Sequence, residues 1–128
     1  WSSDVCSSDL VEISLTDSFK LGVPGIVRDS GDTKKTPGCT LKGPAGAVTL
    51  EEGVIVAARH IHASTADAAK LGVKDMDRVA IRTGGVKSVV FNNVLVRVSD
   101  KFALDFHIDT DEANAAGLKN GDMVEIVA

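Results

Sequence analysis

Two segments of the chain carry the same pattern, TADAAKLGVKDMDRVAI at residues 65–81 and TDEANAAGLKNGDMVEI at residues 110–126. In each, the first threonine and the acidic residues after it predict the start of a short helix. Gly72 and Gly117 then predict a left-handed helix end, which a polar turn and an alternating strand follow. The pattern therefore predicts short helices that join strands, and residues 17–23 repeat its helix–glycine half.

The rest of the chain is rich in short strand-like segments. They are dominated by Val and Ile or alternate apolar and polar residues, which favours β-structure. Asn92-Asn93 between two of them predicts a tight hairpin, because Asn tolerates positive φ. Many short strands with small helical caps predict a mainly β fold, a closed or nearly closed β-barrel. The expected strands are residues 11–15, 48–50, 54–58 continuing to 62, 79–82, 89–91, 94–98, 102–108 and 124–127.

The composition is that of an ordinary globular protein. The 128 residues, 44% hydrophobic and 25% charged, suffice for one compact domain. A formal net charge of −4 provides no basic field for nucleic acid or an anionic membrane, and 4% aromatic residues with no Tyr disfavour base stacking. Two cysteines make no disulfide framework, and no apolar run reaches the length of a membrane span. We therefore expect a soluble protein of the cytoplasm.

The first nine residues, WSSDVCSSD, differ from everything that follows. They repeat the triplet Ser-Ser-Asp and show no apolar periodicity, whereas a clean alternation starts at Val11. A flexible native terminus would also account for them, but we favour non-native sequence and exclude residues 1–9 from the fold. The chain is then expected to begin inside a longer protein.

Residues 22–46 hold six of the twelve glycines and all three prolines. A connection of this length in a compact domain is usually functional, although a plain surface loop has the same composition. Arg28 lies in it, before Asp-Ser-Gly, where a guanidinium and loop N–H groups suit a phosphate. A salt bridge from Arg28 to Asp29 or Asp32 explains the same residues equally well.

His60-Ile61-His62 is the sharpest local signal for chemistry. On a strand, both imidazoles point to one face while Ile61 packs behind them. The third and last histidine, His107, lies in another strand-like segment. Three neutral imidazoles with an open fourth position are typical of a catalytic zinc site. Three unrelated surface or core histidines are the alternative.

Several further side chains carry weaker signals. Cys39, in the turn Pro-Gly-Cys-Thr, has the thiol of an acyl acceptor, but a lone cysteine is more often structural. Arg59, Arg97 and Lys101 suit phosphate binding and suit the role of solvated charges equally well. Asn114 suits a contact to a metal-bound group from the second repeat's helix, where a plain surface asparagine is the default.

Six motifs together resemble the PduL-type phosphotransacylases, also called phosphate propanoyltransferases. They run in one order from Val11 to the C-terminus, which makes the resemblance specific. It implies a protein of two β-barrels with short helical caps, which binds two zinc ions where the barrels meet and moves an acyl group between coenzyme A and inorganic phosphate. The motifs are VEISLTD (11–17), VRDSG (27–31), PGCTLKGP (37–44), GVIVAARHIH (53–62), NVLVRV (93–98) and HIDTDEANAAGL (107–118).

The resemblance also implies roles for particular residues. His60, His62 and His107 match zinc ligands of the family, and Arg28 matches the arginine that holds phosphate beside the metals. Family members carry another His-x-His and a glutamate earlier in the chain, where this sequence has Trp1–Asp9. One of the two zinc sites is therefore expected to be retained here. Asn114 falls within the last of the six motifs.

The resemblance divides the chain into three parts. Residues 1–9 are non-native, residues 10–46 are the end of the first barrel with the Gly/Pro-rich loop, and residues 47–128 form the zinc-binding β-barrel domain. Coenzyme A, acyl phosphate and inorganic phosphate are the implied ligands. A bacterial microcompartment shell, as in propanediol degradation, or another copy of the chain is the implied protein partner. An inactive zinc-binding barrel fragment and a metal-free structural or interaction module are the alternative functions.

Overall fold

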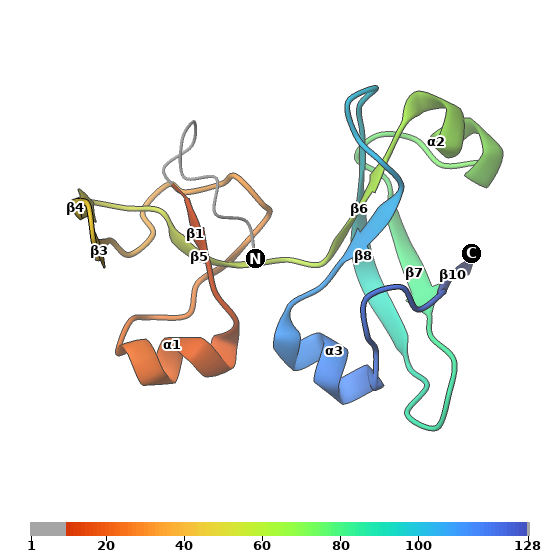
Figure 1. Ribbon diagram of the computed structural model, residues 1–128. Helices are drawn as coiled ribbons and strands as arrows, with labels where there is room; N and C mark the ends of the chain where they lie inside the picture. The colour runs from red at the N-terminus through yellow and green to blue at the C-terminus, as the bar shows by residue number, and fades with distance from the viewer. Residues whose placement is uncertain (1–9, 128) are drawn as a thin grey trace. The chain divides into compact units, whose positions relative to one another are not determined.

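The computed structural model describes residues 10–127, so the prediction of non-native sequence at residues 1–9 lies outside the described residues. The chain divides into two compact units, which adjoin in sequence between Ala57 and Ala58. Both are built from short strands and seven-residue helices (Figure 1). The predicted fold class, mainly β with short capping helices, is confirmed.

The first unit contains a small parallel sheet and a hairpin. Its central strand, β5 (Val54–Ala57), runs parallel to both of its neighbours, β1 (Val11–Glu12) and β2 (Val27–Arg28). Apolar side chains of these strands bury a small core, which Cys39 partly covers. The remaining elements are the helix α1 (Leu15–Leu21) and the antiparallel hairpin of β3 (Cys39–Gly43) and β4 (Gly46–Leu50).

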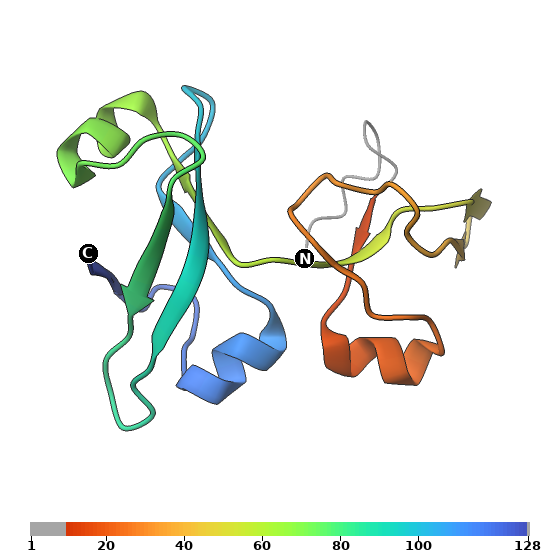
Figure 2. The ribbon, with the colours of Figure 1, turned by 180° about the vertical axis from the view of Figure 1, so that it is seen from behind.

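The second unit is one five-stranded sheet in the order β10-β7-β8-β6-β9, curled into a half-barrel. β6 runs parallel to β8, and every other pair in this sheet is antiparallel. The two helices of this unit lie at opposite ends of the sheet (Figures 1 and 2). The elements are β6 (His60–Ala63), α2 (Thr65–Leu71), β7 (Arg78–Arg82), β8 (Val90–Val98), β9 (Asp105–His107), α3 (Thr110–Ala116) and β10 (Glu125–Val127).

One face of β6 packs into the main core of the second unit. Ile61 and Ala63 are 3% and 0% exposed, and Ala68 of α2 and Ala116 of α3 belong to the same buried cluster. Because successive strand residues point to opposite faces, the histidines at the alternate positions of β6 lie on the other face. The prediction that Ile61 packs behind the histidines is confirmed.

The repeated helices end as predicted but start one residue earlier than predicted. The caps of α2 and α3 are Ser64 and Asp109, whereas Thr65 and Thr110 are the first helical residues. Asp109 forms a capping box with Glu112, in which each side chain accepts from the other residue's backbone N–H. The three helices within residues 10–127 all end at a left-handed glycine, Gly22, Gly72 or Gly117, with φ of 68°, 70° and 65°.

The predicted hairpin at Asn92-Asn93 is wrong, because β8 runs unbroken through both residues. Asn93 has a φ of 57°, and the register of β8 against β7 shifts between Val79 and Ile81. Two residues of β8 therefore lie opposite Ala80 alone, which is a β-bulge. The tolerance of Asn for positive φ is used here to bend a strand and not to reverse the chain.

Three predicted strands are shorter than expected by more than one residue. The strand predicted at residues 11–15 is reduced to β1, because Ser14 caps α1 and Leu15 is its first helical residue. The strand predicted from residue 54 to residue 62 is interrupted at Ala58-Arg59, and its halves, β5 and β6, belong to different units. The strand predicted at residues 102–108 is reduced to β9, because a turn precedes it. Residues 47–57 supply most of β4 and all of β5 in the first unit, and the domain limits given by the resemblance stay a prediction. Among the described residues, no helix has the length and apolar composition needed to cross a membrane.

Candidate metal centre

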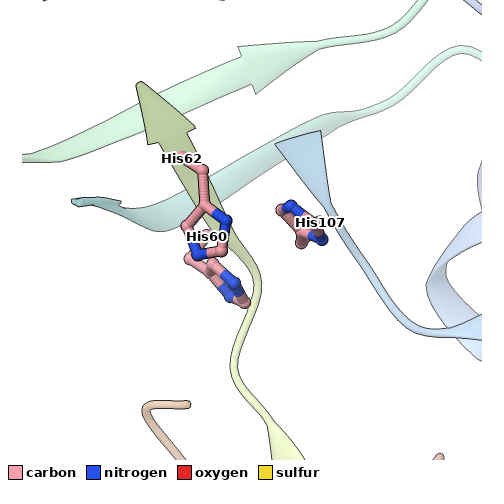
Figure 3. Close-up of side chains that lie close together, drawn as sticks. All are labelled: His60, His62 and His107. Carbon is pink, nitrogen blue, oxygen red and sulfur yellow. The ribbon is translucent and has the colours of Figure 1, made fainter. Parts of the chain in front are cut away.

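All three histidines converge on one face of the curled sheet (Figure 3). His60 lies directly opposite His107 in the antiparallel pair of β6 and β9. His62 follows two residues along β6 and therefore shares the face of His60. One ring nitrogen from each histidine lies within 4.8 Å of the others. The three residues singled out in the sequence as metal ligands are thus brought together.

The three rings pack against one another. Those of His60 and His107 are nearly parallel, with centroids 5.0 Å apart and an interplanar angle of 9°. The His62 ring is tilted against both, with centroids 4.8 Å from that of His60 and 4.4 Å from that of His107. His60 is buried, His62 half-buried and His107 exposed, so the cluster is accessible to solvent at His107.

A backbone contact orients the ring of His60. Its Nδ1 lies 2.8 Å from the carbonyl oxygen of Ala58. Because a carbonyl only accepts, Nδ1 is the donor, and the tautomer of the neutral ring that makes this bond has its lone pair on Nε2. Histidines that bind metals are held in the same way, by a hydrogen bond from the ring nitrogen that does not bind.

His62 is held neutral and has an unsatisfied ring nitrogen. Burial lowers its pKa from 6.5 to about 4, helped by the charges of His107, His60 and Arg97, while Asp105 acts in the opposite direction. Within the described part of the chain, the buried Nε2 of His62 has no hydrogen-bond partner. Such atoms are rare in proteins, because losing water without a replacement costs free energy. A metal ion bound to the lone pair would satisfy this nitrogen.

The donor set fits a divalent transition metal. Imidazole nitrogens suit zinc, copper, iron and nickel, which bind neutral rings of the kind that burial maintains at His62. Three protein ligands with access from solvent also leave coordination positions for a water molecule or a substrate. His60, His62 and His107 could therefore hold a metal ion that remains open to reactants.

Arg59, the residue before His60, is held by hydrogen bonds to two other segments of the second unit. Its Nη1 donates to Glu112 Oε2 at 2.9 Å, and its Nε donates to the carbonyl oxygen of Asn92, also at 2.9 Å. The guanidinium lies 5.2 Å from the centre of the Phe91 ring. Because Glu112 also belongs to the capping box of α3, Arg59 links the start of β6 to the helix that follows β9.

Three different elements carry the other predicted site residues, Arg28, Asn114 and Cys39. Arg28 is on β2 of the first unit, half-buried, with its Nε 3.8 Å from Asp32 Oδ2. Asn114 is exposed on α3, where its carbonyl oxygen accepts from Lys87 Nζ at 3.2 Å. Cys39 begins β3 as a half-buried free thiol. Functional roles for these residues stay predictions.

The histidines have an aromatic partner that was not predicted from the sequence. The Phe102 ring stacks on the His62 ring, with centroids 4.1 Å apart and an interplanar angle of 13°. The Arg97 guanidinium lies 5.9 Å from the centre of the Phe102 ring, and Arg97 is in register with His62 across β6 and β8. The stack depends on the strand register and on the turn before β9. A single sequence does not predict either feature.

Comparisons with known proteins agree with the family resemblance. A family model described as phosphate propanoyltransferase matches residues 5–119. A protein named phosphate propanoyltransferase from Thermotoga maritima is 55% identical over 118 residues, which cover 91% of this chain and 56% of that protein. A protein of the same name from Rhodopseudomonas palustris is 48% identical over 116 residues, covering 91% and 51%. A third, from Lachnoclostridium phytofermentans, is 47% identical over 117 residues, covering 91% and 55%.

The chain spans about half the length of the curated relatives it matches. The family model's match extends over most of both compact units and includes all three clustered histidines. The chain therefore belongs to the phosphate propanoyltransferase family.

Proposed function

We propose that this chain supplies one zinc site of a phosphate acyltransferase, which moves a short acyl group between coenzyme A and inorganic phosphate. The printed names of its relatives, phosphate propanoyltransferase, support the reaction class. The observation that carries the proposal is the unsatisfied, buried Nε2 of His62 beside two further imidazoles. The resemblance implies two zinc ions in the family, and the histidines of this chain account for one.

The three histidines would hold the zinc through neutral nitrogens, with His60 oriented by its bond to the Ala58 carbonyl. Zinc bound there supplies a Lewis acid that can bind a phosphate oxygen and stabilise negative charge on a thioester carbonyl. His107, the exposed member of the three, leaves the approach from solvent open. The buried His60 and the half-buried His62 would bind the zinc from the protein side.

Arg28 would bind the remaining phosphate oxygens. A guanidinium can donate two hydrogen bonds to a phosphate, which fixes its direction of attack. The contact of Arg28 with Asp32 is long, at 3.8 Å, and the arginine side chain is 36% exposed. Because an exposed ion pair of this length is weak, phosphate can displace Asp32 as the partner of Arg28.

We propose direct transfer between the two substrates. A phosphate oxygen attacks the thioester carbonyl carbon, the carbon–sulfur bond breaks, and the coenzyme leaves as its thiolate while acyl phosphate is released. Cys39 would be the acyl carrier in the alternative two-step route. Its thiol is half-buried against the small core of the first unit, which supports a structural role.

An inactive zinc-binding barrel fragment is the second candidate, because the chain covers only 51–56% of the length of the three relatives described above. A metal-free structural or interaction module is the third. The family resemblance alone supports three further parts of the proposal. These are binding to a microcompartment shell, self-association, and a location in the cytoplasm or a microcompartment. Zinc binding separates the second candidate from the third, and turnover separates the first from both.

The test uses the full 128-residue chain with propanoyl-CoA and inorganic phosphate. Released thiol and propanoyl phosphate are measured together, with zinc present and after chelation. We expect both products to form in equal amounts, and chelation, His107→Ala and Arg28→Gln each to abolish them. Lys34→Gln, which removes another cation of the same glycine-rich segment, is the matched control and should retain the rate. Zinc binding without either product would favour the inactive fragment.

A further inference from the structure

Two histidines of the cluster differ in how their rings are held. His60 has a hydrogen bond that fixes the orientation of its ring, and within the described part of the chain His62 does not. The Nδ1 of His60 donates to the Ala58 carbonyl, whereas among the described residues no hydrogen bond to either ring nitrogen holds the His62 ring. A metal ligand whose ring is free to rotate loses entropy on binding, so something else must hold the ring plane of His62. The only aromatic ring other than histidine stacked on it in the described chain is that of Phe102.

We propose that Phe102 is a positioning residue for the metal centre, which holds the His62 ring in its binding orientation by stacking on it. The centroids are 4.1 Å apart and the planes are within 13° of parallel, so the two rings contact face to face. Rotation of the His62 ring out of this plane would break the contact. This inference rests on the proposed metal site and names a residue outside the ligand set.

The position of Phe102 is itself fixed relative to β6. The backbone N–H of Phe102 donates to the Ser99 carbonyl at 3.0 Å, which closes a turn. The N–H of Ser99 donates to the carbonyl of Ala63, the residue after His62, also at 3.0 Å. At the same turn, the Thr65 hydroxyl donates to the Asp100 carboxylate. The turn that presents Phe102 is thus anchored to the end of the strand that carries His62.

Phe106 provides a matched control. It lies on β9 opposite Ile61 and packs against the buried core cluster on the other face of the sheet. Its ring is near that of Phe91, at 6.1 Å between centroids. A loss of apolar packing at Phe106 should therefore lower the stability of the second unit without removing the stack on His62.

The test is a cobalt(II) titration of the full chain, followed by the visible absorption of the bound ion and checked for folding by circular dichroism. We expect Phe102→Leu to weaken cobalt binding about 10-fold and to alter the absorption bands, since outer-layer residues of metal sites commonly have effects of 10–100-fold. Phe102→Tyr, which keeps the ring, should restore both. Phe106→Leu should lower the melting temperature and leave affinity and bands unchanged.

Unchanged affinity and bands in folded Phe102→Leu would overturn the role of Phe102 while leaving the metal site intact. If Phe102→Leu does not fold, Phe102→Met, which keeps the volume without a ring, gives the same comparison with Phe102→Tyr. Failure of the unaltered chain to bind cobalt or zinc would overturn the proposed function together with this inference. If Phe102→Leu and Phe106→Leu lose the same cobalt affinity, a general loss of stability is responsible. That result would also overturn the positioning role of Phe102.

Discussion

His60 and His107 face each other across neighbouring antiparallel strands, with their rings almost parallel and 5.0 Å apart. The register of β6 and β9 determines this pairing, and the alternation of β6 adds His62 to the same face. The opposite face of β6 is packed into the core through Ile61. A one-residue slip of β6 would move both of its histidines into the core face, so the core that fixes the register also assembles the cluster.

The stability of the metal-free chain should fall as the pH is lowered from 7 towards 4.5. The pKa of His62 is about 4 in the folded chain and 6.5 at its ordinary value, so between these values the unfolded chain binds a proton that the folded chain does not. Stability is therefore lost as the pH falls through this window. Urea unfolding at several pH values, with chelator present, measures the slope.

His62→Gln is the matched variant for this measurement, because glutamine is polar and does not titrate. The other titrating groups are common to both proteins, so the difference between their stability curves reports His62. We expect the variant to lose less stability on acidification. Parallel curves for the two proteins would show that His62 is not held neutral by its surroundings.

The ion pair between Arg59 and Glu112 should contribute to the stability of the second unit. The two side chains are only 31% and 19% exposed, and Glu112 serves the capping box as well. We expect Glu112→Gln to lower the free energy of unfolding by about 1–2 kcal/mol, because partial exposure reduces the contribution of a hydrogen bond to a charged group. Glu125→Gln is the control, since its pair with Arg82 is 61% and 55% exposed and should contribute under ~1 kcal/mol. Equal effects of both variants on urea unfolding would contradict this account.

Gly38 should not tolerate a larger side chain. A Cβ atom there would overlap the backbone carbonyl oxygens of Leu50 and Glu51, which cannot move without breaking the start of the hairpin. We expect Gly38→Ala to destabilise the first unit by roughly 2 kcal/mol or more. At Gly43, the last residue of β3, a Cβ would meet nothing within 4 Å, so Gly43→Ala is the control. Thermal unfolding of the two variants measures the difference, and similar melting temperatures would count against the close packing at Gly38.

Direct transfer predicts that the thiol of Cys39 is dispensable. Cys39→Ala should leave the rate of propanoyl phosphate formation within about 2-fold, the size of a ~0.4 kcal/mol change in the barrier. Mass spectrometry of the chain after incubation with propanoyl-CoA should find no propanoyl group on Cys39. A hydroxylamine-sensitive adduct on that residue, or a loss of several orders of magnitude in Cys39→Ala, would replace the direct route by an acyl-cysteine route.

Short sequence patterns predicted the features of the fold that depend on neighbouring residues, such as helix ends and strand alternation. The left-handed glycines Gly72 and Gly117 end their helices as expected, because only Gly adopts that conformation without strain. Strand alternation likewise predicted that His60 and His62 share a face. The helix starts were misplaced by one residue, since Ser64 and Thr65 are both good caps and the sequence alone does not rank them.

Long-range features could not be predicted in the same way. The positive φ of Asn93 is compatible with a hairpin turn and with a β-bulge. The bulge forms because β8 pairs with β7 on both sides of this residue. The ion pair of Arg59 with Glu112 and the stack of Phe102 on His62 join segments far apart in sequence. Only the strand order β8-β6-β9 brings these segments together.

The most direct measurement is the zinc content of the purified chain by elemental mass spectrometry, for the unaltered protein, for His62→Ala and for Thr49→Ala on the hairpin of the first unit. A three-histidine site predicts about one zinc per chain in the unaltered protein and in Thr49→Ala, and close to none in His62→Ala. Equal zinc contents in all three proteins, or no zinc in any of them, would contradict a metal centre at His60, His62 and His107.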